Sequence, residues 1–167
     1  MDPLLNQSLG IAGSVLALSF SAVGSALGCG TAACAAVGAW KRCFVQGRQA
    51  SMMLLSFVGA PLSQTIYGMV LMFSMRGYAE QGAPGIALLV IGAAAGLAIG
   101  WSAWYQGRAA AASADSFAET EKGFTNYFGA LGVVETVAIF VMVLAMIVLG
   151  STVPAEAVAE AATAVAP

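Results

Sequence analysis

Four long stretches of this sequence are almost free of charged side chains, and they restrict the chain to a helical, membrane-embedded fold. Residues 3–40, 49–75 and 81–107 contain no Asp, Glu, Lys or Arg, and residues 123–155 contain only Glu135. Each stretch exceeds the ~20 apolar residues that a helix needs to cross a bilayer. The whole chain of 167 residues is 60% hydrophobic, with 6 basic and 8 acidic side chains, which is too few to solvate a soluble domain of this size.

We therefore expect an all-α membrane protein with four transmembrane helices, at about 9–40, 50–75, 84–113 and 124–150. The first two helices form one hairpin (1–80) and the last two form a second (81–150), followed by an Ala-rich tail (151–167). Only short connections remain between the helices. This leaves no room for a large aqueous active site or a nucleic-acid surface.

Basic residues gather at one end of the expected bundle. They lie in the first connection (Lys41, Arg42, Arg48) and beside the last one (Arg108, Lys122), whereas the opposite end has only Arg76. The positive-inside rule then predicts that the connections 41–49 and 114–123 are cytoplasmic and that both termini are outside. Because the start of the chain lacks the basic residues of a signal peptide, we expect the first helix to be retained.

The two hairpins resemble each other in sequence. "SQTIYGMVLMFSM" (63–75) aligns with "VETVAIFVMVLAM" (134–146), and "GSALGCGTAACAA" (24–36) aligns with "WSAWYQGRAAAAS" (101–113). This pattern indicates a duplicated hairpin. Gln64 in the first copy matches Glu135 in the second, and Cys29 matches Gln106, so the duplicated protein keeps one mid-membrane carboxylate instead of two.

The first and third helices are rich in small residues, whereas the second and fourth are bulky. Glycines spaced by four residues let helix backbones approach closely, and they occur at Gly24, Gly28, Gly92, Gly96 and Gly100. This composition favours a ring with an inner circle of small helices and an outer, lipid-facing circle. An ordinary four-helix bundle with mixed packing would explain the glycines nearly as well.

Glu135 is the only charge of the fourth helix, and a carboxylate at the bilayer centre costs about 2.5–3.5 kcal/mol unless partners satisfy it. The second helix offers four residues on one face: Ala60, Ser63, Gln64 and Tyr67. Pro61 frees a backbone carbonyl there, and Gln106 adds an amide from the third helix. Hard oxygen ligands of this kind suit a cation such as Na⁺, whereas a proton would need only the carboxyl and one acceptor. Alternatively, the amides only hold helices together.

"GAPLSQTIYG" (59–68), "WYQGRAAAA" (104–112) and "GVVETVAIF" (132–140) resemble the proteolipid of V-type rotary ATPases, of the bacterial K-subunit or eukaryotic c-subunit type. The resemblance covers roughly residues 10–150. It implies Na⁺ ligands at Glu135, Gln64, Ser63, Gln106 and the Ala60 carbonyl, and a tyrosine, Tyr67, that hydrogen-bonds the carboxylate. Position 60 is often Leu in the family and position 63 is often Thr, but both retain the ligand oxygen here.

The resemblance also implies how such a chain works and with what. Identical subunits form a ring that turns against a stator (a/I-type) subunit and is joined to central-stalk subunits, in a membrane that we expect to be the bacterial cell membrane. The chain itself should hydrolyse nothing, because it has no phosphate-binding loop. H⁺ remains the alternative to Na⁺ as the carried ion.

Two other classes of protein would also have four membrane helices. A small cation-coupled secondary antiporter could use the same carboxylate, although such exporters carry theirs in the first helix among aromatic residues. A purely structural four-span protein would leave Glu135 and its counterpart Gln64 unexplained. The number of copies in the assembly separates these alternatives, because only a rotor requires a ring of many subunits.

Overall fold

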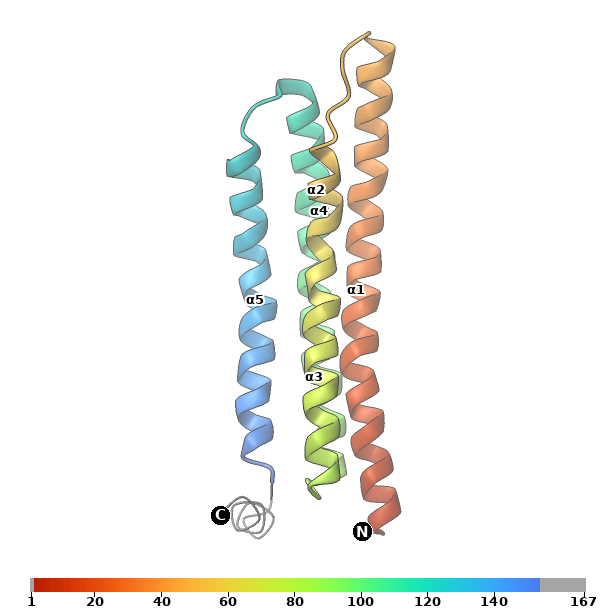
Figure 1. Ribbon diagram of the computed structural model, residues 1–167, viewed down its shortest axis with the longest axis vertical. Helices are drawn as coiled ribbons and strands as arrows, with labels where there is room; N and C mark the ends of the chain where they lie inside the picture. The colour runs from red at the N-terminus through yellow and green to blue at the C-terminus, as the bar shows by residue number, and fades with distance from the viewer. Residues whose placement is uncertain (1, 154–167) are drawn as a thin grey trace, which may run out of the picture.

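The computed structural model describes residues 2–153, which form four long helical rods. The elements are α1 (Pro3–Val45), α2 (Leu54–Gly59), the 3₁₀ turn η1 (Ala60–Leu62), α3 (Ser63–Glu80), α4 (Gly85–Thr120) and α5 (Phe124–Gly150). The short α2 and η1 continue into α3, so these three make up the second rod (Figure 1). All four rods are long and apolar enough to cross a membrane, which confirms the expected all-α membrane fold. Most of the Ala-rich tail lies outside the described residues.

The first helix is longer than the expected 9–40, because capping rather than hydrophobicity determines where it begins. Its N-terminus has Asp2 as the N-cap, whose carboxylate accepts a hydrogen bond from the Leu4 amide at 3.0 Å, and Pro3 occupies the first helical position. At 1.5 Å per residue, the helix Pro3–Val45 is about 65 Å long. It therefore extends beyond the ~30 Å hydrocarbon core of a bilayer.

The hairpin tips also differ from the expected 41–49 and 114–123, because charged residues continue the helices instead of ending them. The first connection is 46–53 and the last is 121–123, where Glu121 and Gly123 adopt positive φ angles of 54° and 79°. The second rod covers Leu54–Glu80 instead of 50–75, and α4 ends at Thr120 instead of 113. Outside the apolar layer, charged side chains are solvated and do not interrupt a helix. The helix therefore ends where the backbone conformation changes.

Both hairpin tips lie at the same end of the bundle, and the short connection 81–84 lies at the other (Figure 1). Ion pairs join the tips of the two hairpins. Arg42 of α1 contacts Asp115 and Glu119 of α4, and Arg48 lies 3.8 Å from Glu121. These pairs are largely solvent-exposed, so each contributes only about 0–1 kcal/mol. They align the tips without determining the fold.

The glycines of the first and third helices pack against each other inside one chain. A Cβ atom on Gly24 would lie 2.0 Å from the Gly100 carbonyl oxygen, and one on Gly92 would lie 2.1 Å from the Gly13 carbonyl oxygen. A Cβ on Gly28 would come within 2.4 Å of the Ala103 carbonyl oxygen. The small-residue faces expected to line a ring therefore form the α1–α4 contact of a single protomer, where backbone touches backbone.

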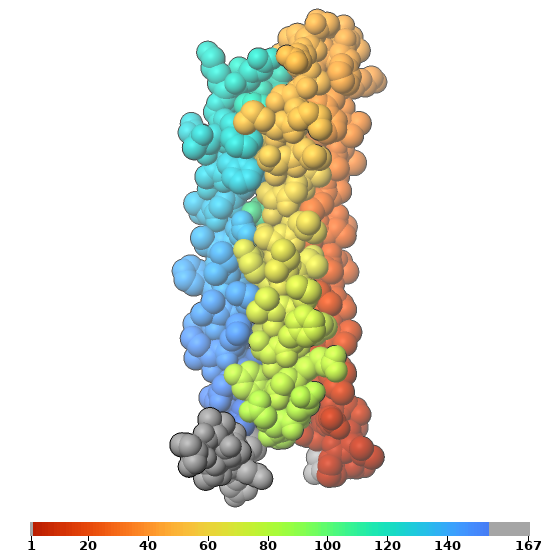
Figure 2. Space-filling model, viewed as in Figure 1, coloured from red at the N-terminus to blue at the C-terminus, as the bar shows by residue number. Residues whose placement is uncertain are grey.

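The fourth helix is the least covered of the four. Of the residues of α5, only Leu131, Ala138 and Leu149 are buried, whereas Val133 and Phe140 are 70% and 66% exposed. Figure 2 shows α5 beside the second rod on one broad face of the molecule, with α1 along the edge. This helix thus presents bulky apolar side chains outward, as a lipid-facing or subunit-facing helix does.

Candidate ion-binding site

The candidate site lies between two apolar clusters that fill the bundle above and below it. The cluster towards the tips includes Phe57 and Leu131, and the cluster towards the termini includes Leu71 and Ala138. Glu135 falls between Leu131 and Ala138 on α5, and Gln64 falls between Phe57 and Leu71 on the second rod. A polar group at this depth is shielded from water on both sides, so it must find its partners within the protein.

The break in the second rod positions the first oxygens of the site. Pro61 cannot donate a backbone hydrogen bond, and the helix tightens into the 3₁₀ turn η1 around it. At this turn the Ser63 hydroxyl donates to the carbonyl oxygen of Ala60 at 3.2 Å and lies 3.2 Å from Oε1 of Gln64. The 3₁₀ turn thus gathers the oxygens of Ala60, Ser63 and Gln64.

A chain of hydrogen bonds connects these oxygens to the carboxylate. Nε2 of Gln64 donates to Oε1 of Gln106 at 2.7 Å, and Nε2 of Gln106 donates to Oε2 of Glu135 at 3.3 Å. The Tyr67 hydroxyl donates to Oε1 of Glu135 at 2.6 Å. The structure therefore brings together all six residues selected from the sequence, from α3, η1, α4 and α5.

The burial of the two amides shows that this network belongs to the interior. Gln64 and Gln106 are 0% exposed, and both carboxamides have partners, so their polar groups are not stranded in the apolar core. Glu135 is only partly buried. Its carboxylate accepts two hydrogen bonds from inside the bundle, and the residue is not fully enclosed by the rest of the chain.

The chemistry of these donors suits a hard cation. The Ala60 carbonyl, the Ser63 hydroxyl and the Gln64 amide oxygen are neutral oxygens, and Glu135 supplies the one negative charge. Within residues 2–153 there is no group of three or more His, Cys, Asp or Glu side chains that could hold a metal ion. A monovalent ion needs only one charge for neutrality, which is the number present here.

Two further contacts of the site were not predicted from the sequence. The Ser102 hydroxyl donates to the Val134 carbonyl oxygen at 3.0 Å, and Nε2 of Gln106 also donates to the Leu131 carbonyl oxygen at 3.0 Å. Both contacts hold α4 against α5 beside the carboxylate. Ser102 lies one helical turn before Gln106, so its position on the same face was a usable signal.

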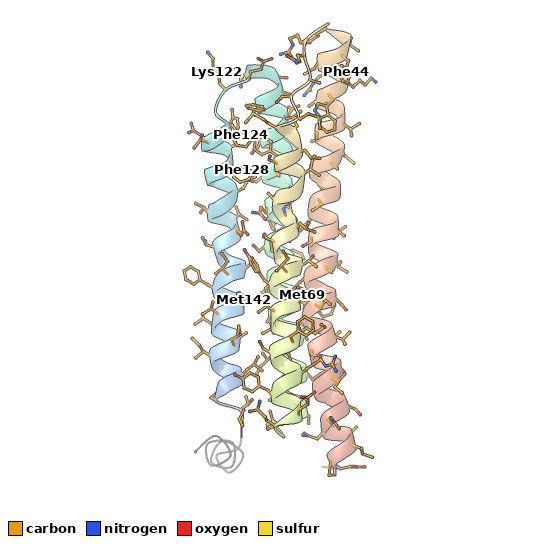
Figure 3. All side chains as sticks on the ribbon, in the orientation of Figure 1. Phe44, Met69, Lys122, Phe124, Phe128 and Met142 are labelled. Atoms are coloured by element: carbon orange, nitrogen blue, oxygen red, sulfur yellow. The ribbon has the colours of Figure 1, made fainter. Side chains whose placement is uncertain are left out.

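Aromatic side chains close the site towards the hairpin tips. The Phe57 ring packs against Phe124 and Phe128 with centroids 5.2 and 6.1 Å apart, and against Phe117 at 6.1 Å. Figure 3 shows Phe124 and Phe128 on the first turns of α5, near the tip and above the middle of the bundle. This cluster separates the amide network from water at the tips.

One segment of the chain matches a known protein family. Residues 89–148 match the family model of the ATP synthase C subunit. The second hairpin is thus similar to this family over most of its length. The matched segment includes both Gln106 and Glu135, and supports a c-ring proteolipid: a multi-pass membrane protein that moves ions and has no catalytic site of its own. This family implies a ring within a rotary ATPase that also has stator and stalk subunits. No curated protein matches the chain.

Proposed function

We propose that the chain is a rotor subunit of a V-type ATPase, carrying Na⁺ across the membrane on Glu135 as the ring turns against the stator. The observation that carries the proposal is the hydrogen-bonded set Gln64, Gln106, Tyr67 and Glu135 within a chain whose second hairpin matches the c-ring proteolipids. The tips 46–53 and 121–123 would face the central stalk in the cytoplasm, by the distribution of basic residues.

The V-type assignment is supported by the asymmetry of the duplicated hairpins. Gln64 stands where the second hairpin has Glu135, so four helices share one carboxylate. One ion per four helices gives fewer ions per turn than one ion per hairpin. Fewer ions per turn let each hydrolysed ATP move an ion against a larger gradient, which favours a pump.

Sodium is favoured over a proton by the neutral oxygens that lie along the hydrogen-bonded chain leading to the carboxylate. The Glu135 carboxylate accepts hydrogen bonds from Tyr67 and Gln106, and a proton on it would need only one acceptor, which the Tyr67 hydroxyl oxygen could supply. The gathered oxygens of Ala60, Ser63 and Gln64 then have no evident role in proton binding. Gln106 would add its own Oε1, which lies 2.7 Å from Nε2 of Gln64 beside this set.

The proposal predicts that Na⁺ protects Glu135 from a carbodiimide, which reacts only with the protonated carboxyl. Sodium and protons compete for the same group, so Na⁺ binding lowers the protonated fraction by mass action. In membranes containing the assembled protein, labelling of Glu135 should be slowed by Na⁺ at fixed pH and ionic strength. Replacing Na⁺ with K⁺ serves as the control and should give no protection.

The variants Gln64→Leu and Gln106→Leu test, in the same experiment, whether the two amides contribute to Na⁺ binding. Each removes an amide oxygen while keeping the carboxyl, so Glu135 should still react. Half-protection should require at least about fivefold more Na⁺, given the ~1–3 kcal/mol that a lost buried polar partner costs. If wild-type labelling depends on pH alone, the carried ion is H⁺. The rotor assignment would survive that result.

The rotor assignment has a separate test, which is the number of copies in the assembly. Beside the site, α4 and α5 form an apolar groove of about 800 Å³ lined by residues such as Leu97, Trp101 and Val137, and α5 is largely uncovered. A second copy seated there would bury both surfaces. Native mass spectrometry of the detergent-extracted protein should therefore show a closed ring of many subunits, whereas a monomer or dimer would favour an antiporter.

A further inference from the structure

The hydroxyl of Ser25 is buried in α1, and the site described so far gives it no hydrogen-bond partner. Ser25 is 2% exposed, and its Oγ has no hydrogen-bond partner among residues 2–153. Ser21, one turn earlier on the same face of α1, differs: its hydroxyl donates to the Ala17 carbonyl oxygen at 2.8 Å. A buried hydroxyl without a partner is costly, so its presence requires a reason.

The packing of α1 against the second rod places Ser25 opposite Gln64. A Cβ on Gly68 would meet the Ser21 side chain at 2.6 Å, and one on Gly28 would meet the Pro61 side chain at 2.9 Å. The two rods are antiparallel neighbours, as Figure 1 shows. On α1, Ser25 lies one helical turn from both Ser21 and Gly28. On the second rod, Gln64 lies one turn from both Pro61 and Gly68. Because the rods are antiparallel, Ser25 and Gln64 fall at the same level between these two contacts.

The duplication supports the same position independently. In the alignment of "GSALGCGTAACAA" with "WSAWYQGRAAAAS", Ser25 matches Ser102, and in the second alignment Ser63 matches Val134. Ser102 bonds across to the Val134 carbonyl at the site. Its counterpart Ser25 therefore stands beside the Ser63–Gln64 segment in the first hairpin.

We propose that Ser25 is a positioning residue that holds the Gln64 carboxamide with its oxygen directed at the carried cation. The inference rests on the proposed sodium function and extends it to a residue of α1. Because Oγ of Ser25 has no direct partner within residues 2–153, the hydroxyl would accept the second N–H of Gln64 through one buried water.

The orientation of this carboxamide decides whether it attracts or repels a cation. Its Nε2 uses one N–H on Gln106, and its Oε1 lies beside the Ser63 hydroxyl. The other N–H of Gln64 has an acceptor at Ser25 only when Nε2 lies on the α1 side and Oε1 lies on the Ser63 side. In the reversed orientation the N–H groups would face the oxygens of Ala60 and Ser63, and the cation would lose a ligand and meet a positive dipole.

Ser25→Ala tests the proposal, with Ser21→Ala as the matched control. Membranes carrying each assembled variant are labelled with carbodiimide at fixed pH over a range of Na⁺ concentrations. The Na⁺ concentration for half-protection of Glu135 should rise about three- to tenfold in Ser25→Ala, which is the loss of one hydrogen bond, and should not change in Ser21→Ala. Ser25→Cys, which keeps the size and weakens the hydrogen bond, should shift it in the same direction.

The labelling rate without Na⁺ separates positioning from a general structural effect. It should be the same in wild type and Ser25→Ala, since Ser25 does not touch the carboxylate. Equal half-protection in wild type and Ser25→Ala would overturn the inference. So would an equal shift in Ser21→Ala, or a changed rate without Na⁺. If Na⁺ fails to protect even the wild type, the sodium proposal itself is wrong and this inference fails with it.

Discussion

Glu135→Gln is expected to abolish both ion transport and carbodiimide labelling of the chain. The substitution keeps the size of the side chain but removes the only charge between residues 123 and 155. Without that charge, the surrounding neutral oxygens cannot hold a cation in a low-dielectric layer, and no proton can be exchanged at this position. Transport by the reconstituted ATPase should fall to background, and mass spectrometry should find no carbodiimide adduct within α5.

Matched controls for this prediction come from carboxylates outside the apolar layer. Glu80→Gln at the end of α3 and Asp115→Asn near the α4 tip change the charge by the same amount, and both residues lie away from the site. Both variants should transport normally. Transport that persisted in Glu135→Gln would refute the role of Glu135 as carrier, whichever ion is carried.

Gly24→Ala is expected to prevent α1 and α4 from packing. The added Cβ would lie 2.0 Å from the carbonyl oxygen and 2.3 Å from the Cα of Gly100. Both are backbone atoms, so no change of side-chain rotamer can relieve the overlap. The two helices must therefore separate along the contact. Overpacking of this kind costs about 1–3 kcal/mol when side chains can adjust, and we expect at least the upper end where only backbone is available.

The measurement is the thermal stability and yield of the detergent-extracted protein, with Gly30→Ala as control. Gly30 lies on the same helix with no atom within 4 Å of an added Cβ. Its replacement should be neutral, or stabilise α1 by up to about 1 kcal/mol through helix propensity. If Gly24→Ala is as stable as Gly30→Ala, the close α1–α4 crossing is wrong.

Much of the candidate site could be predicted from the sequence because it depends on helical spacing. Ala60, Ser63, Gln64 and Tyr67 recur three or four residues apart, which places them on one face of any helix. The duplicated pattern pairs Gln64 with Glu135 and places Gln106 at the matching position of the third helix. In the structure these residues form one hydrogen-bonded network. Their role as ion ligands stays a prediction.

The bond of Ser102, and the position that we infer for Ser25, depend on which helices are neighbours. A serine in an apolar helix commonly bonds to its own backbone, as Ser21 does, so its sequence alone does not mark a site. Ser102 differs because α5 presents the Val134 carbonyl to it. Ser25 differs because it does not bond to its own backbone, and the contacts on either side of it lead us to infer that it faces Gln64. The spacing of residues within one helix does not show which other helix its serines will face.

The membrane class, the four spans, the repeat and the single carboxylate could all be read from the amino-acid order. These features follow from short-range properties, namely the length of apolar runs and the spacing of polar residues, which act before any helix meets another. The helix ends and the partners of the glycines, in contrast, required the folded chain. Helix ends depend on local backbone turns at Glu121 and Gly123, and charged residues beyond the apolar run do not interrupt a helix. The glycines of α1 and α4 permit any close crossing, so their actual partners, such as Gly24 and Gly100, are set by the register in which two whole helices pack.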